Sequence, residues 1–228
     1  MQRFKVSEVF RSIQGEGEAV GLPSDFIRLY TCNLTCSWCD TKYTWVGQDR
    51  AIEGKDFIYL TSREIIDRLT KIGNTKHVTI TGGEPLLQPI EELVMELKGK
   101  GRSVIIETNG TIEPSETLLN LVDIWSISPK TSNSGTKYDY GKMQWINRTK
   151  GYYLKFVVVN PSEDIREISQ FVDSRGIKDN KVILQPNGVS RNYEKCVTEL
   201  MDYAVSAALP YRVVPQIHRL AWGLTRGK

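Results

Sequence analysis

Long apolar runs are missing from this sequence of 228 residues, of which 40% are hydrophobic. No stretch approaches the roughly 20 consecutive apolar residues that are needed to span a bilayer. The first residues, MQRFKVSEVF, also lack the apolar core and the cleavage site of a secretory signal peptide. We therefore expect a protein of the cytoplasm that has no membrane partner.

A strong charge imbalance is missing as well, because 30 basic residues face 27 acidic ones and leave a net charge of +3. Proteins dedicated to nucleic acid usually gather Lys and Arg on one face or along one helix. Here the basic residues are scattered along the chain, so we expect no nucleic-acid partner.

Cysteine is scarce, and three of the four cysteines, Cys32, Cys36 and Cys39, lie within eight residues of one another. Thiols in the cytoplasm stay reduced, so such a group indicates a metal centre or catalysis rather than a disulfide. Cys196 stands far from the others in a helical pattern, where we expect a small buried side chain.

Short runs rich in β-branched residues alternate with amphipathic helical patterns. The apolar runs are FIRLY (26–30), HVTIT (77–81), SVIIET (103–108), DIWSIS (123–128), YYLKFVVV (152–159), KVILQ (181–185) and YRVVPQ (211–216). Apolar residues recur at helical spacing in 62–72, 89–97, 162–172 and 193–207. Strands that alternate with helices favour βα units around a parallel sheet. About six units are too few for an eightfold barrel, so the sequence predicts an α/β fold of the open, partial (β/α)6 type.

Polar motifs follow six of these apolar runs. They are TCNLTCSWCDT (31–41), GGEP (82–85), TNG (108–110), PKT (129–131), PNG (186–188) and QIH (216–218). In parallel α/β folds the carboxyl ends of the strands form the active-site face. We therefore expect the six loops to meet at one mouth.

The spacing Cys32-x3-Cys36-x2-Cys39 is the strongest single signal. Iron–sulfur cubanes are normally held by four thiolates, and three thiolates leave one iron open to a small molecule. One alternative is a structural zinc site completed by His77 or His218. A redox dithiol is a weaker alternative because the third cysteine would be superfluous. Zinc sites more often use paired C-x2-C units, so the spacing favours an iron–sulfur centre.

A C-x3-C-x-W-C motif after one strand and GGEP after the next resemble the radical S-adenosylmethionine (SAM) superfamily. The wider pattern is similar to one family within it, the 7-carboxy-7-deazaguanine synthases of queuosine biosynthesis. The matching segments are FRSIQGEG (10–17), FIRLYTCNLTCSWCDT (26–41), ITGGEP (80–85), ETNG (107–110), SISPK (126–130), LQPNG (184–188) and QIH (216–218). This resemblance implies one radical SAM domain over 1–228, with a substrate-binding extension at 1–25 and the partial barrel and C-terminal tail at 26–228.

The resemblance implies three cofactors: a [4Fe–4S] cluster on Cys32, Cys36 and Cys39, SAM at the open iron, and Mg2+ at the hydroxyl of Thr41. Mg2+ prefers oxygen ligands, although a Thr in this position also suits the cap of the next segment. The SAM-binding residues that it implies are Trp38, Gly83, Glu84, Ser128, Pro129, Lys130, Gln185 and Pro186. Adjacent glycines let a ligand approach the backbone, but the same segments on their own would be read as turns.

The implied substrate is 6-carboxy-5,6,7,8-tetrahydropterin, which a carbon–nitrogen lyase converts to 7-carboxy-7-deazaguanine with loss of ammonia. The substrate-binding residues implied are Ile13, Gln14, Gly15, Glu16, Arg28, Thr81, Glu107, Gln216 and His218. Glu107 is the first choice to accept the 2-amino and N3 donors, and Glu16 the second. The guanidinium of Arg28 suits the 6-carboxylate, although strand alternation could instead turn it to solvent.

Two other functions stay open at this point. A radical SAM activase that forms a glycyl radical on a partner protein shares the cysteine motif and needs no pterin pocket. A zinc-stabilised binding module, for example for RNA, would bind zinc and no SAM, but neither a basic stripe nor a stacked aromatic motif supports it. Because the chain has no second cysteine cluster, we expect an external electron donor of the flavodoxin or ferredoxin type. We also expect a homodimer, since an open barrel leaves an edge to cover.

Overall fold

The computed structural model describes residues 2–141 and 143–228. Its strands are β1 (Arg3–Ile13), β2 (Pro23–Leu29), β3 (Ile58–Thr61), β4 (His77–Gly82), β5 (Ser103–Thr108), β6 (Ile124–Ile127), β7 (Tyr152–Val158), β8 (Val182–Pro186) and β9 (Arg212–Val213). Its α-helices are α1 (Ser62–Lys71), α2 (Glu91–Gly99), α3 (Glu116–Leu121), α4 (Pro161–Ser174), α5 (Tyr193–Ser206) and α6 (Ile217–Trp222).

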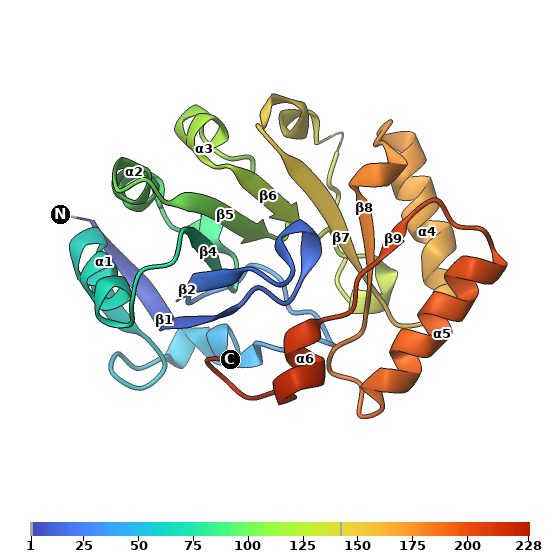
Figure 1. Ribbon diagram of the computed structural model, residues 1–228, viewed down its shortest axis with the longest axis horizontal. Helices are drawn as coiled ribbons and strands as arrows, with labels where there is room; N and C mark the ends of the chain where they lie inside the picture. The colour runs from blue at the N-terminus through green and yellow to red at the C-terminus, as the bar shows by residue number, and fades with distance from the viewer. Residues whose placement is uncertain (1, 142) are drawn as a thin grey trace.

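The strands form one open sheet with the order β3-β1-β2-β4-β5-β6-β7-β8-β9. Each neighbouring pair from β2 to β9 is parallel. The seven apolar runs of the sequence become these parallel strands in chain order, which confirms the predicted open α/β fold. In Figure 1 the sheet curves without closing, and helices α1 to α5 lie around its outer side.

The parallel strands read as continuous apolar runs because they are buried on both faces. In β5, for example, Val104, Ile105 and Ile106 all have no exposed surface. Helix α1 covers the part of the sheet formed by β1 and β3 and begins at a capping box: the Thr61 hydroxyl accepts the Glu64 N–H at 3.3 Å, and the Glu64 carboxylate accepts the Thr61 N–H at 2.8 Å.

Four elements were not expected from the sequence: β1, β3, α3 and α6. Strand β1 is antiparallel to β2, and β3 is antiparallel to β1, so both extend the sheet at one edge. The expected boundary between 25 and 26 therefore falls inside β2. The sequence pattern did not predict β1 because charged side chains occur along its length. Such side chains are tolerated there because β1 lies near the edge of the sheet and is only partly buried.

Helix α6 lies at the open side of the curved sheet, next to the C-terminal end of the chain (Figure 1). The N–H of Ile217 donates to the carbonyl of Gly15 at 3.1 Å, and Nε of Arg219 donates to the carbonyl of Gly188 at 2.8 Å. The helix thus connects the β1–β2 turn with the loop after β8. The expected QIH loop is in fact the start of this helix.

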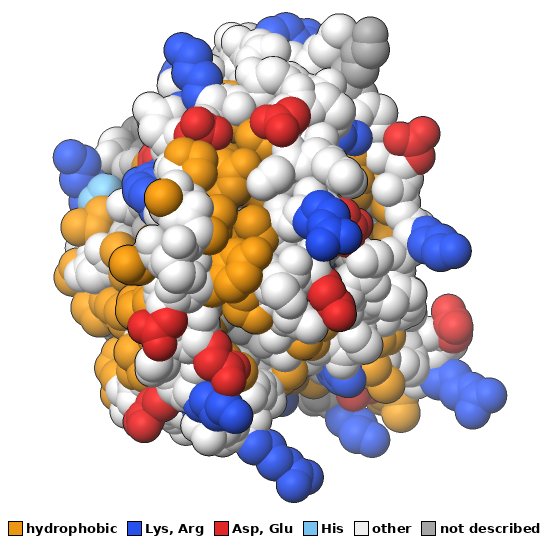
Figure 2. All heavy atoms as spheres, turned by 90° about the vertical axis from the view of Figure 1, so that its right-hand side faces the viewer, with side chains coloured by type: hydrophobic (Ala, Val, Ile, Leu, Met, Phe, Trp, Pro, Cys, Tyr) orange, Lys and Arg blue, Asp and Glu red, His pale blue; other side chains and the backbone are white. Residues whose placement is uncertain are grey.

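Helix α5 is less deeply packed than the other long helices. Figure 2 shows its side of the molecule, on which hydrophobic side chains form a band bordered by charged ones. Met201 and Val205 on α5 are exposed, and Cys196 on the same helix is only half-buried, so the expected burial of Cys196 is not complete. In the described part of the chain, no helix has both the length and the apolar character needed to cross a membrane.

Candidate active site

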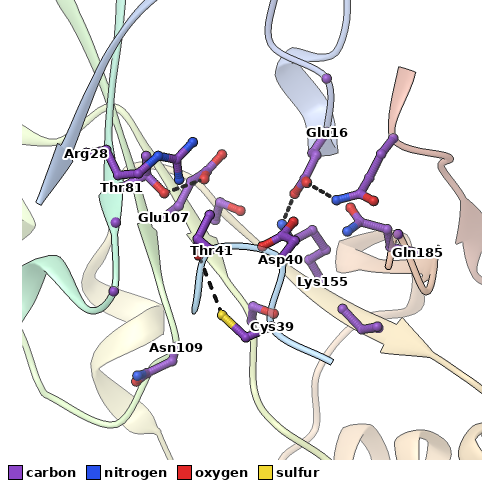
Figure 3. Close-up of a pocket in the computed structure, with 18 of the residues that line it drawn as sticks. Glu16, Arg28, Cys39, Asp40, Thr41, Thr81, Glu107, Asn109, Lys155 and Gln185 are labelled. Carbon is purple, nitrogen blue, oxygen red and sulfur yellow. Dashed lines mark hydrogen bonds and ion pairs between the residues drawn. The ribbon is translucent and has the colours of Figure 1, made fainter. Parts of the chain in front are cut away.

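One cavity opens at the carboxyl ends of the parallel strands, where the sequence places its polar motifs. Eighteen of the predicted site residues line it: Ile13, Gln14, Gly15, Glu16, Arg28, Cys32, Cys36, Trp38, Cys39, Thr41, Thr81, Gly83, Glu107, Ser128, Lys130, Gln185, Gln216 and His218. They come from β2, β4, β5 and β8, from the loops after β2, β4 and β6, and from the end of β1 and the start of α6 with the residues next to them. Figure 3 shows how several of these side chains face one another across the cavity.

The cysteine loop begins directly after β2 and crosses the end of β4. Thr31 precedes it with a φ of 87°, a left-handed value that is unusual for a β-branched residue. A Cβ atom on Gly83 would lie 2.0 Å from the carbonyl oxygen of Thr31 and 2.9 Å from Cβ of Cys32. Only glycine lets the two loops approach this closely, which explains the GG pair without recourse to a ligand.

Two thiols of the loop, Cys32 and Cys36, hold their protons more tightly than free thiols do. Burial raises the pKa of Cys32 to about 11 and also raises the pKa of Cys36, which the nearby positive charge of Lys130 lowers in part. Metal binding must therefore release protons here, as is general for thiolate sites.

Within the described residues, no group of three or more His, Cys, Asp or Glu side chains converges on a single point that could hold one metal ion. The cysteines of a cubane bind different iron atoms and need not converge in this way. His77 begins β4 at the amino end of the strand, whereas the cysteines lie at the carboxyl ends. It therefore cannot complete a zinc site with them.

Glu84 does not line the cavity, and its expected contact with SAM stays a prediction. Its carboxylate is 0% exposed and accepts hydrogen bonds from the Thr108 hydroxyl at 2.8 Å, the Asn109 N–H at 2.7 Å and the Leu86 N–H at 3.0 Å. It ties the 82–85 loop to the end of β5. Pro129 and Pro186 are also buried beside the cavity without lining it.

The other predicted SAM contacts form one wall of the cavity. Nζ of Lys130 donates to the Ser128 hydroxyl at 2.7 Å and lies 5.3 Å from the ring centroid of Trp38. The indole N–H of Trp38 donates to Oδ1 of Asn133 at 3.0 Å, which fixes the ring. Oε1 of Gln185 is buried without a hydrogen-bond partner in the described part of the protein. A buried acceptor of this kind normally has a donor, so it suits a ligand hydroxyl or amine.

Glu107 stands at the end of β5 between two donors. Its carboxylate accepts the Thr81 hydroxyl at 2.8 Å (Figure 3). It also accepts Nε2 of Gln14 at 3.0 Å. These bonds fix the carboxylate in the cavity and leave further lone pairs for a ligand, because each oxygen can accept two hydrogen bonds.

Arg28 faces the cavity rather than solvent. Its Nε donates to Oε2 of Glu8 at 2.9 Å, and its guanidinium carbon lies 5.6 Å from the ring centroid of Phe10. Glu8 also accepts the hydroxyl of Tyr43 at 2.8 Å and Nε of Arg226 at 3.0 Å. This anchoring through Nε leaves the two Nη groups of Arg28 available to bind an anion end-on.

Lys155 on β7 is a cavity residue that the sequence analysis missed. It is 8% exposed and forms a salt bridge with Glu16, which is 9% exposed and also accepts Nε2 of Gln216 at 2.5 Å (Figure 3). The signal was present, because Lys155 is the one charged residue in the run YYLKFVVV, as Arg28 is in FIRLY. Burial alone would lower the pKa of Lys155, but the charge of Glu16 raises it.

The Glu16–Lys155 pair gives the stability of the protein a defined dependence on acid. Burial would raise the pKa of Glu16, but Lys155 and His218 lower it from 4.5 to about 2. A carboxyl with a lowered folded-state pKa stabilises the fold above its unfolded pKa and loses this contribution as the pH falls through the folded pKa. We therefore expect the wild type to lose stability relative to the double variant Glu16→Gln/Lys155→Met between about pH 4.5 and about pH 2.

Urea unfolding of both proteins at several pH values measures this difference. Well above about pH 4.5 the ionisation of Glu16 should no longer change the difference in the free energy of unfolding between the two proteins, whatever its sign. A difference that also stays constant below about pH 4.5 would show that Glu16 is not ionised against Lys155 in the folded protein.

A model of the radical SAM superfamily matches residues 26–184. The chain therefore belongs to the radical SAM superfamily, whose members use a [4Fe–4S] cluster and SAM. The 7-carboxy-7-deazaguanine synthase of Pyrobaculum aerophilum is 36% identical over 99% of this chain and 98% of that protein, and the one of Bacillus cereus is 35% identical over the full length of both. Within the superfamily, the chain belongs to the family of the 7-carboxy-7-deazaguanine synthases.

A solved structure agrees with this membership. The crystal structure of QueE from Escherichia coli superposes with a TM-score of 0.71 at 27% identity and covers 94% of each chain. The structure of Streptococcus suis SuiB bound to S-adenosylmethionine, at 16% identity and a TM-score of 0.53, shares the fold alone.

Proposed function

We propose that this protein converts 6-carboxy-5,6,7,8-tetrahydropterin to 7-carboxy-7-deazaguanine with loss of ammonia, as a carbon–nitrogen lyase of the radical SAM type. The observation that carries the proposal is that one cavity joins the three-cysteine loop to a fixed guanidinium, Arg28, and a fixed carboxylate, Glu107. The two ionic groups match the two handles of the carboxypterin. The near full-length similarity to the synthases supports the same reaction.

The cofactor side of the cavity fits a cluster and SAM. Cys32, Cys36 and Cys39 would hold the cluster, which together with SAM supplies the one-electron chemistry of the reaction. Lys130 would neutralise the carboxylate of SAM, and the unpaired Oε1 of Gln185 would accept one of its donors. Gly83 lets its own loop approach the cysteine loop closely. The ring of Trp38 forms part of the cavity wall next to these two loops.

The substrate side orients the pterin between opposite charges. Arg28, anchored by Glu8, would bind the 6-carboxylate through both Nη groups, while Glu107 would accept the 2-amino and N3 hydrogens. Gln14 and Thr81 hold Glu107 in place. Because Glu16 is already committed to Lys155 and Gln216, we assign it the role of positioning these two side chains rather than of reading the pyrimidine edge.

Several finer assignments belong to the same proposal. Mg2+ would bind at Thr41, whose hydroxyl lies 3.6 Å from Sγ of Cys39 and faces the cavity (Figure 3). The electron would come from a donor of the flavodoxin or ferredoxin type. The hydrophobic side chains exposed on α5 support a homodimer. We also assign residues 1–228 to one domain. The location would be the cytoplasm, where thiols stay reduced.

The test is a product assay under anaerobic conditions. Protein reconstituted with iron and sulfide is incubated with dithionite, SAM, Mg2+ and 6-carboxytetrahydropterin, and mass spectrometry is used to detect 7-carboxy-7-deazaguanine. We expect the product from the reconstituted protein and none from the same protein before reconstitution. If 5′-deoxyadenosine formed without the deazaguanine, the radical SAM class would hold and the substrate would be wrong. A colourless zinc protein that is inert towards SAM would overturn the proposal as a whole.

A further inference from the structure

The segment after the cysteine loop folds back over it. Two 3-10 helices, η2 (Lys42–Thr44) and η3 (Gln48–Arg50), form this segment. Oε1 of Gln48 accepts the N–H of Cys32 at 3.2 Å, and its Nε2 donates to the carbonyl of Cys32 at the same distance. The first cysteine is thus held on both sides of its backbone by a side chain that lies sixteen residues further along the chain.

Trp45, between the two 3-10 helices, contacts the third cysteine directly. Its indole N–H donates to Sγ of Cys39 at 3.2 Å. The ring is half-buried and lines the cavity. Hydrogen bonds from Trp45 N to the Lys42 carbonyl at 3.1 Å and from Gln48 N to the Trp45 carbonyl at 3.0 Å fix the backbone that presents it.

This contact differs in kind from the other hydrogen bonds around the loop, except that the Thr41 hydroxyl also lies 3.6 Å from Sγ of Cys39. The sulfur of Cys32 accepts the backbone N–H of Leu34 at 3.5 Å, which any residue at that position would provide. The indole of Trp38 lies inside the cysteine motif but donates to Asn133 instead of a sulfur. A donated N–H from a side chain is a property of Trp45 itself and can be removed by substitution.

We propose that the indole N–H of Trp45 hydrogen-bonds the Cys39 sulfur of the bound cluster and raises its reduction potential. The inference rests on the proposed cluster site. One electron from a reductant such as dithionite takes the cluster from the 2+ to the 1+ state and increases the negative charge on the sulfurs. An N–H donor stabilises this added charge, and hydrogen bonds to the sulfurs are among the factors that set cluster potentials. The effect is stronger at a half-buried site than in bulk water.

The experiment compares wild type, Trp45→Phe and Trp38→Phe, each reconstituted with iron and sulfide and kept free of SAM and substrate. A dithionite titration followed by electron paramagnetic resonance gives the midpoint potential of each cluster. We expect the midpoint of Trp45→Phe to shift to more negative values than that of wild type. Trp38→Phe also removes an indole beside the cluster but no N–H···S bond, so its shift should be clearly smaller. Equal midpoints for Trp45→Phe and wild type, or equal shifts for the two variants, would overturn the inference.

A second measurement uses the wild-type fold and so does not depend on how well Trp45→Phe assembles its cluster. Protein with 15N-labelled indole side chains is reduced, and electron spin-echo modulation detects 15N nuclei coupled to the cluster spin. We expect a coupling in wild type that persists in Trp38→Phe. A reduced cluster without any 15N coupling, or with a coupling that Trp38→Phe removes, would refute the hydrogen bond while leaving the proposed function intact. Failure of the wild type to assemble any [4Fe–4S] cluster would refute both.

Discussion

Replacing Lys155 by methionine should destabilise the protein by about 3–5 kcal/mol, because it leaves the buried carboxylate of Glu16 without its counter-charge. The two side chains are almost equally buried, at 10% and 11% exposure, so solvent screens their interaction little. For a chain of this length each kcal/mol corresponds to roughly 2–4 °C in the unfolding temperature. We therefore expect a decrease of roughly 6–20 °C, measured by calorimetry on protein without a cluster.

Two further variants show whether the lost charge pair is the cause. Glu16→Gln/Lys155→Met removes both charges and should recover most of the unfolding temperature, since an apolar or neutral replacement of a whole buried pair is often close to neutral. Arg148→Met breaks an exposed ion pair with Glu113 and Glu116 and should cost no more than about 1 kcal/mol. A Lys155→Met protein as stable as Arg148→Met would contradict the prediction.

Replacing Gly83 by alanine should impair cluster assembly and slow SAM cleavage by about 100-fold, the size of effect that a displacement of about 1 Å can have at a reacting centre. The φ of Gly83 is not in the left-handed region, so backbone strain is not the reason. The added Cβ would lie 2.0 Å from the Thr31 carbonyl oxygen, which itself accepts the Glu84 N–H at 2.8 Å. The backbone must therefore move, and Cys32 is the next residue.

Iron and sulfide content after reconstitution, together with the rate of 5′-deoxyadenosine formation, measures the effect. The matched control is Gly99→Ala at the end of α2, where an added Cβ meets nothing within 4 Å and the φ is again not left-handed. This control should keep the wild-type iron content and rate. If Gly83→Ala kept the wild-type iron content and rate, the loop after β4 and the cysteine loop could move apart without harm to the cluster, and the prediction would be wrong.

The sequence predicted the site residues best where the information is local. The cysteine motif, the GG pair and the polar residues after the strands all lie within a few positions of a strand end. A parallel sheet brings the carboxyl ends of its strands to one edge, so these residues meet there. Arg28 was found through the family resemblance, and it is also a charge that interrupts an apolar strand. Lys155 obeys the same rule and was overlooked because no recognisable motif surrounds it.

The sequence left the direction of some side chains undecided, although it placed their loops at the cavity. Glu84 stands in the expected loop, but the loop turns its carboxylate inward to Thr108 and Asn109, where three donors compete with any ligand. Neither the periodicity nor the motif encodes which way a side chain turns after a strand end. Trp45 likewise follows the cysteine motif by six residues, and only the folding back of 42–50 brings its N–H to the sulfur of Cys39.

The sequence by itself determined the order of the seven parallel strands and of helices α1, α2, α4 and α5, the open parallel sheet, and the grouping of three cysteines at its mouth. These features follow from periods of two and 3.6 residues and from spacings of a few residues. Only the tertiary structure decided how the cavity is completed. Glu16 meets Lys155 and Gln216, which lie 139 and 200 residues away, and Glu8 meets Arg226 across 218 residues. The pairings of Gln216 and Arg226 depend on where α6 and the chain end cross the open side of the sheet, and no short-range pattern specifies that crossing.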